Sequence, residues 1–420
     1  MKKLFLILLL ITNLFWGLTF KDGKQVKEII KTDETIKKND NSFIKPQSVL
    51  FSDEIYYQIM ALPTDEKIKS CGFAVISVDW STIDKGLPAK IEGYNSRMDN
   101  DHIVQGSYAR GVFYAYSTAA TYVFLKQDEK LKEKLFDKLY QWSMEEALLA
   151  TKICYNRADD GKKIRTECEG EWSDPNGQDL APIKDSSVSI EIAMGLNYIY
   201  DLLFEEYQVS DPRHKTIKAY FRQWYERVPL SKNFFWGLQM NYAVPNILIA
   251  QQSNENFNDL ITTLANGANE WINNDGSLKD RTTRGNRALW YHHTAMAEAL
   301  MVMELSKAAK LELPKDFENK FLKAADLFYK SYLDNSYITP WAKKAHNSQF
   351  NPSIPNYQDF PDQLGKIAFE GWWMWAFQYR YPSNPLSLLF KEKLSKYSAS
   401  IRADLSYGLG LGCIYKTLLS

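Results

Sequence analysis

The feature that most constrains the fold of this chain is the helical spacing of its apolar residues. Apolar side chains recur at intervals of three and four along long segments, which is typical of helices buried on one face, whereas strict alternation is scarce. The segments with this spacing are 103–126, 129–153, 186–206, 213–227, 238–252, 256–273, 287–310, 315–333 and 362–380. Nine or more long helices exceed a four-helix bundle, so we expect an all-α ring of antiparallel helix pairs.

The N-terminal stretch MKKLFLILLLITNLFWGLTF joins two lysines to an apolar run. This pattern predicts a signal peptide over residues 1–19, since an uncleaved anchor, the alternative, would need about 20 apolar residues to span a membrane. Residues 20–47 are rich in Lys, Asp and Glu and poor in aromatics, which predicts a disordered polar tether. We therefore expect one domain over 48–420, exported to the periplasm or secreted, with no stable membrane anchoring after cleavage.

Charge and cysteine content narrow the class of protein further. The chain has 51 basic and 51 acidic residues, which argues against a nucleic-acid binder with a wholly basic surface. Cys71, Cys154, Cys168 and Cys413 do not follow a zinc-binding pattern. In an exported protein Cys154 and Cys168 could close a short loop, although spacing alone leaves the pairing open.

Basic residues gather at the start of one predicted helix. The stretch RTTRGNRALWYHH, residues 281–293, holds three arginines, one tyrosine and two of the five histidines. A helix N-terminus carries the positive end of the backbone dipole and therefore favours anions over cations. Cations placed against that preference indicate that the stretch binds an anion, with free backbone N–H groups assisting.

The spacing within this stretch suggests a chemical role. Arg287 and Tyr291 are four residues apart and would share a helix face, and Arg284 reaches the same side if the helical path extends that far. An arginine fork is a good receptor for a carboxylate, and a nearby cation stabilises a phenolate. These groups would suit the removal of a proton next to a carboxylate. In the alternative interpretation the arginines pair with acids such as Asp280 or Glu298, and Tyr291 is a core aromatic.

Two motifs resemble those of the helical alginate lyases. The family signature runs approximately D-G-x-L and then R-G-x-R-A-L-x-Y-H. Its positions here are Asp275, Gly276, Leu278, Arg284, Gly285, Arg287, Ala288, Leu289, Tyr291 and His292. AKIEGYNSR, residues 89–97, is similar to the family's early substrate loop, and a weaker likeness covers roughly 80–380.

This resemblance implies an incomplete (α/α) toroid and a polysaccharide lyase that needs neither metal nor cofactor. Such an enzyme cleaves an anionic, uronate-containing polysaccharide or oligosaccharide by β-elimination. Tyr291 matches the family's catalytic tyrosine, and Arg284 matches the arginine that helps to neutralise the substrate carboxylate. Lys90 and Arg97 match substrate-loop residues, and Arg287 and His292 are further candidates for binding the substrate.

The chain departs from the family at the start of a central helix. The family has an Asn-Asn-His run there, whereas WGLQMNYAV places Gln239, Met240 and Asn241 at these positions, followed by Tyr242. We expect Asn241 to neutralise the carboxylate, with Gln239 and Tyr242 in substrate contact. The histidines that could take the vacant role are His102, His292 and His293.

Tryptophans offer a second type of sugar contact. Trp172 lies in the polar loop EWSDPNGQD, so we expect it to stack on a sugar ring. The stretch EGWWMWAF, residues 370–377, is instead expected to form a buried wall.

Two other functions remain open. One is a glycoside hydrolase on the same helical toroid, which would need two carboxylates about 5–10 Å apart. Its candidate residues are Glu191, Asp201, Glu270, Asp275, Glu298 and Glu370, among which spacing singles out no pair. The other is a carbohydrate-binding relative that has lost catalysis, which the missing histidine would explain.

Overall fold

The computed structural model describes residues 48–71, 78–92, 100–159, 163–171, 180–228, 257–344, 358–360, 371–395 and 407–419. The expected segments 1–19 and 20–47 and the predicted helix 238–252 lie outside the described residues. Among the described residues no helix is long and apolar enough to cross a membrane.

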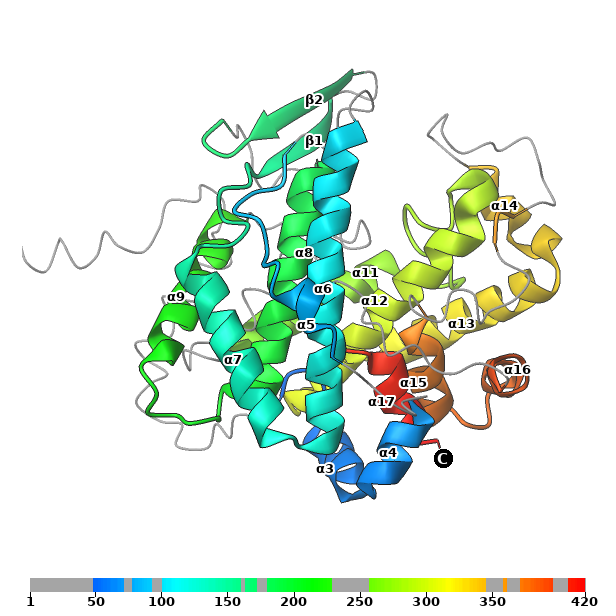
Figure 1. Ribbon diagram of the computed structural model, residues 1–420. Helices are drawn as coiled ribbons and strands as arrows, with labels where there is room; N and C mark the ends of the chain where they lie inside the picture. The colour runs from blue at the N-terminus through cyan, green and yellow to red at the C-terminus, as the bar shows by residue number, and fades with distance from the viewer. Residues whose placement is uncertain are drawn as a thin grey trace, which may run out of the picture.

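Helices make up most of the described chain (Figure 1). The first half contains α3 (Asp53–Ala61), α4 (Thr64–Ser70), α5 (Trp80–Ile83), α6 (Asn100–Lys126), α7 (Glu129–Met144), α8 (Lys184–Ile199), the π-helix η1 (Tyr200–Phe204) and α9 (Arg213–Arg227). The second half contains α11 (Phe257–Trp271), the 3₁₀-helix η3 (Gly285–Arg287), α12 (Ala288–Ala308), α13 (Phe317–Leu333), the 3₁₀-helix η4 (Asn335–Ile338), α14 (Thr339–Ala342), α15 (Trp372–Arg380), α16 (Pro385–Leu394) and α17 (Leu411–Thr417).

The helices pack mainly against their neighbours along the chain, as expected for helix pairs arranged in a ring. In the first half α6 packs against α7 and α8, and α7 packs against α9. In the second half α11 packs against α12, and α12 against α13 and α15. α12 is buried on nearly all sides, and most of its own buried side chains are apolar or small. It runs through the middle of the molecule (Figure 1). This helix carries the signature tyrosine, Tyr291, and two carboxylates, the partly buried Glu298 and the buried Glu304.

One predicted helix is shorter than its periodicity suggested. We expected a helix over 129–153, but α7 ends at Met144. Glu146 and Leu148 adopt positive φ angles of 51° and 64°, which a right-handed helix does not allow. The N–H of Leu148 donates instead to the carbonyl of Pro88, 2.8 Å away. Tertiary pairing with a distant segment therefore ends this helix.

A small antiparallel sheet follows α7, which helical spacing did not predict. It consists of β1 (Cys154–Asp159), β2 (Lys163–Cys168) and β3 (Leu180–Pro182) in the order β2-β1-β3. Its strands are rich in charged residues and lack an apolar alternation, so their sequence gives little strand signal. Cys154 pairs with Cys168 in the ladder, and a disulfide joins them. The structure thus resolves the pairing that spacing left open.

Distant parts of the chain are joined near the ends of the described domain. A second disulfide connects Cys71 with Cys413, 342 residues apart. The Asp201 carboxylate in the π-helix accepts hydrogen bonds from the Ser48 hydroxyl and the Val49 N–H. These contacts fix the first described residues and α17 to the helical body.

Candidate active site

The helix that carries the signature motif begins without a side-chain cap of its own. Arg287 stands at the N-cap of α12 and makes no capping hydrogen bond. Gln358, from a segment far along the chain, performs this function. Its Oε1 accepts from the Leu289 N–H, and its Nε2 donates to the Gly285 carbonyl, both at 3.0 Å. A distant amide thus fixes the start of α12 by satisfying one of its unpaired N–H groups.

A tight turn connects α11 to the basic loop of residues 279–287. Gly276 in the Asn-Asp-Gly sequence has a φ of 84°, and a Cβ there would lie 2.4 Å from the Lys323 carbonyl oxygen. The Asp275 carboxylate accepts from the N–H and the hydroxyl of Ser277, which closes the turn. Glycine is therefore required for both the backbone conformation and the close approach to α13.

Arg284 and Tyr291 lie together, as their spacing suggested. The guanidinium carbon of Arg284 is 5.2 Å from the centroid of the Tyr291 ring. Arg284 is only 2% exposed, whereas Tyr291 is partly buried. Burial, followed by repulsion from the nearby Arg281, lowers the pKa of Arg284 to about 10. A cation held in a poorly hydrated setting beside a phenol is well suited to receive an anion.

Arg281 is a third member of this cluster, which sequence reasoning missed. Its guanidinium carbon lies 5.3 Å from the same Tyr291 ring centroid, and the residue is 5% exposed. Its Nη2 is 3.9 Å from Oε1 of Glu298, which lies on α12. Burial lowers the pKa of Arg281 despite the opposing effect of Glu298. The spacing of Arg281 and Arg284, three residues apart, was the available signal for this pair.

Arg287 stands just before α12, outside the regular helix on which its four-residue spacing from Tyr291 was interpreted. Residues 285–287 form a 3₁₀ turn, and the α-helix begins only at Ala288, so the expected helical geometry does not extend back to Arg287. The side chain of Arg287 is 55% exposed, and its Nε lies 3.3 Å from Oδ2 of Asp359. Arg287 therefore pairs with a surface acid, in line with the alternative interpretation of this residue.

His292 also occupies a different setting from the predicted substrate contact. It is 0% exposed, and its Nε2 donates to the Ala324 carbonyl at 2.9 Å. Thr282 Oγ1 already accepts from the Leu278 N–H, so its hydroxyl donates to His292 Nδ1 at 2.9 Å. Burial lowers the pKa of His292 to about 4, so the ring stays neutral. His292 connects the basic loop to α12 and α13 rather than facing a substrate.

His293 is likewise a core residue. Trp373 Nε1 donates to His293 Nδ1 at 3.0 Å, and burial lowers the pKa of His293 to about 3. Trp372 and Trp375 are also buried, at 2% and 4% exposed. The predicted wall formed by this tryptophan-rich stretch is therefore confirmed for the described residues of α15.

Several predicted site residues are not brought together by the described structure. Lys90 lies at the surface, where its Nζ is 2.8 Å from Oε2 of Glu92. The predicted residues outside the described part of the chain are Arg97, Trp172, Gln239, Asn241 and Tyr242. Within the described residues no group of three or more His, Cys, Asp or Glu is arranged to hold a metal ion.

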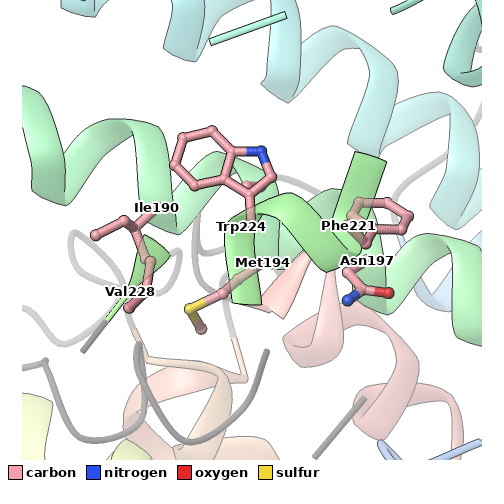
Figure 2. Close-up of a pocket in the computed structure, with 7 residues that line it drawn as sticks. Ile190, Met194, Asn197, Phe221, Trp224 and Val228 are labelled. Carbon is pink, nitrogen blue, oxygen red and sulfur yellow. The ribbon is translucent and has the colours of Figure 1, made fainter. Parts of the chain in front are cut away.

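A small pocket lies elsewhere, between α8 and α9 (Figure 2). Its lining is almost wholly apolar, with Asn197 as its one polar side chain. The lining residues are Ile190, Ala193, Met194, Asn197, Phe221, Trp224 and Val228. None belongs to the basic loop or to α12, so this pocket is separate from the arginine–tyrosine cluster.

Comparisons with known proteins identify the fold. No protein-family model and no curated protein matches the sequence. Among solved structures, alginate lyase A1-III from Sphingomonas species A1 is similar, with a TM-score of 0.58 and 14% identity over 90% of this chain and 98% of that chain. A variant of that enzyme complexed with a tetrasaccharide gives the same TM-score and coverage at 15% identity. At this level of identity the likeness shows that the chain shares the α/α toroid of these enzymes.

Proposed function

We propose that this protein is a polysaccharide lyase that cleaves a uronate-containing, alginate-like polymer or oligomer by β-elimination. The observation that carries the proposal is the buried Arg284 guanidinium, 5.2 Å from the ring of the partly buried Tyr291. These two residues occupy the signature positions of a family whose fold the chain shares. A cation beside a phenol on this fold is the equipment that the reaction requires.

The first chemical step is removal of the C5 proton of a uronate. This proton becomes acidic when the adjacent carboxylate is neutralised, because the developing enediolate then carries less net charge. We assign that neutralisation to Arg284 and Asn241, and one well-placed donor of this kind contributes about 3–4 kcal/mol. Tyr291 as phenolate takes the proton, and the neighbouring guanidinium stabilises its charge before the transfer.

The second step breaks the bond between C4 and the glycosidic oxygen. The C5–H electron pair forms the new C4–C5 double bond, and the electrons of the broken C4–O bond leave with the oxygen. Tyr291, now a phenol, returns its proton to that oxygen. The products are a chain with a new hydroxyl end and a chain with an unsaturated uronate, so atoms and charge balance without a co-reactant.

The structure gives less support to a hydrolase. Four of the six carboxylates considered for that chemistry already have structural partners. Asp201 accepts from Ser48 and Val49, and Glu191 accepts from the Ser187 hydroxyl. Asp275 closes the turn before the basic loop, and Glu298 faces Arg281.

Ultraviolet spectroscopy on a panel of substrates tests the proposal. The purified protein is incubated with polymers and oligomers of mannuronate, guluronate and glucuronate, and absorbance of the new double bond is followed. We expect absorbance to rise with at least one of them. New reducing ends without that absorbance would indicate hydrolysis, and binding with neither product would indicate a carbohydrate-binding relative; either result contradicts a lyase.

We also propose that the protein acts outside the cytoplasm, in the periplasm or after secretion. Two disulfides support this location, because cysteine pairs persist mainly in oxidising compartments. Fractionation of cells followed by detection of the chain tests it, and recovery in the cytoplasm with reduced cysteines would contradict it.

A further inference from the structure

We infer that Arg281 is a second carboxylate-binding residue, which holds the acidic group of the sugar together with Arg284 beside Tyr291. This inference rests on the proposed lyase function and assigns a role to the arginine that the family signature leaves unassigned. It rests on the position of Arg281, on its partner Glu298, and on the residue that replaces the family histidine.

The position of Arg281 places it within reach of the same ligand group as Arg284. The two guanidinium carbons lie 5.3 and 5.2 Å from one ring centroid, that of Tyr291. A carboxylate has two oxygens and about four lone-pair sites, so it can accept hydrogen bonds from two guanidinium groups at once. The two arginines are also close enough for Arg281 to lower the pKa of Arg284, so a carboxylate bound between them beside Tyr291 would contact both.

The charges of the cluster favour an additional anion. Arg281 and Arg284 are 5% and 2% exposed, and their mutual repulsion contributes to the lowered pKa of Arg284. Nη2 of Arg281 lies 3.9 Å from Oε1 of Glu298, a separation longer than a hydrogen bond. A carboxylate bound beside Tyr291 would therefore offer Arg281 a closer anionic partner than Glu298.

The sequence indicates why a second cation would be needed. Met240 stands where the family has a histidine, and methionine cannot carry charge or donate to a carboxylate. His292 and His293 are both buried and neutral, with their ring contacts made inside the protein. Among the described residues beside Tyr291, Arg281 is the cation that can take over this role.

Binding of charged and uncharged ligands to matched variants tests the inference. Tetrauronates of mannuronate, guluronate and glucuronate, and their carboxyl-reduced, neutral counterparts, are titrated by calorimetry into Tyr291→Phe protein, which prevents turnover. Adding Arg281→Met should weaken binding of the charged ligand about 10- to 100-fold, the loss of one charge-assisted hydrogen bond, and leave the neutral ligand within about two-fold. Lys279→Met removes an exposed positive charge from the same loop and should change neither affinity by more than about two-fold.

Three outcomes would overturn the inference. They are an unchanged affinity for the charged ligand, an equal loss for charged and neutral ligands, and no measurable tetrauronate binding before Arg281 is changed. If Arg281→Met does not fold, Arg281→Lys keeps the charge and should lose only a few-fold of affinity, again for the charged ligand alone. Failure of the proposed function looks different, since the wild-type protein would form no double bond whatever Arg281 does to binding.

Discussion

Two glutamates of α12 each lie against an arginine that has little solvent exposure, and the two pairs differ sharply. Toward the C-terminal end, Arg380 Nε and Nη2 donate to the two oxygens of Glu304 at 2.8 and 2.6 Å. At the middle of the helix, Nη2 of Arg281 lies 3.9 Å from Oε1 of Glu298. We call these the closed pair, Glu304–Arg380, and the open pair, Glu298–Arg281. The part of α12 that carries the closed pair is the closed end, and the part that begins at the basic loop and carries Tyr291 is the open end.

The difference between the two pairs appears in the pKa of each arginine. Burial alone would lower the pKa of Arg380, but its hydrogen bonds to Glu304 reverse this effect and leave the pKa raised. For Arg281 the effect of burial prevails, and the pKa is lowered. A carboxylate that holds a cation through two short hydrogen bonds makes a structural element, whereas the longer contact of Arg281 is consistent with the proposed role in binding a further anion. The same residue types on one helix therefore serve stability at one end and, in our proposal, chemistry at the other.

The largest expected effect is on turnover, which a substitution at the open end should reduce and one at the closed end should not. Tyr291→Phe at the open end should reduce the rate of double-bond formation about 10⁴-fold, because one group acts as both base and acid. Tetrauronate affinity should stay within about three-fold, and the melting temperature within about 2 °C, because the ring remains. The matched control is Tyr381→Phe, which removes a hydroxyl that donates to Glu318 near the closed pair and should leave turnover unchanged. An active Tyr291→Phe protein would show that the acid and base has been misassigned.

The next effect is on the free energy of unfolding, which should fall more when the closed pair is broken than when the open pair is broken. Glu304→Gln leaves Arg380, whose side chain is only 12% exposed, without a compensating charge and should lower the free energy of unfolding by about 3–5 kcal/mol. Glu298→Gln should cost less than about 1 kcal/mol, because its contact with Arg281 is long and contributes little. Urea unfolding of both variants beside the wild type measures the difference. Equal losses would remove the distinction between a closed and an open pair.

The sequence could predict part of the open end because that part is local. Arg284 and Tyr291 are seven residues apart in one motif, and the structure brings them together. Gln358 caps α12 from 69 residues beyond Leu289, and no periodicity or propensity links such positions. The burial of His292 was missed for the same reason, since it depends on packing against α13.

The sequence likewise predicted some elements of the fold and missed others. The segments 213–227 and 315–333 were predicted to within two residues of α9 and α13, because apolar spacing along one helix is a local property. The end of α7 and the sheet after it were not predicted. Both depend on pairing between segments that lie apart in the sequence, and the sequences of β1 and β2 show no apolar alternation.

A smaller effect concerns pH, and it should originate near the open end. His292 titrates near pH 4 in the folded protein and near 6.5 when unfolded, so below pH 6.5 the unfolded state binds the extra proton. The contribution of His292 to the free energy of unfolding should therefore be fully present above pH 6.5 and decrease as the pH falls, by roughly 3 kcal/mol by pH 4. Unfolding at several pH values measures the slope. His292→Gln should reduce the slope of unfolding free energy against pH by the contribution of one histidine. An unaltered slope would show that His292 is not the group responsible.

The smallest effect tests whether the open end depends on the position of its loop. Thr282→Val removes the hydroxyl that joins the Leu278 N–H to His292 Nδ1, and should lower the free energy of unfolding by about 1–2 kcal/mol. Thr282→Ser keeps the hydroxyl and is the matched control. Because Thr282 lies between Arg281 and Arg284, the valine variant should also weaken binding of a charged tetrauronate several-fold, whereas Glu304→Gln should leave that affinity unchanged in molecules that remain folded. If both variants weakened binding in proportion to their loss of stability, affinity would follow the whole fold, and the arginine cluster would not act as a separately positioned receptor.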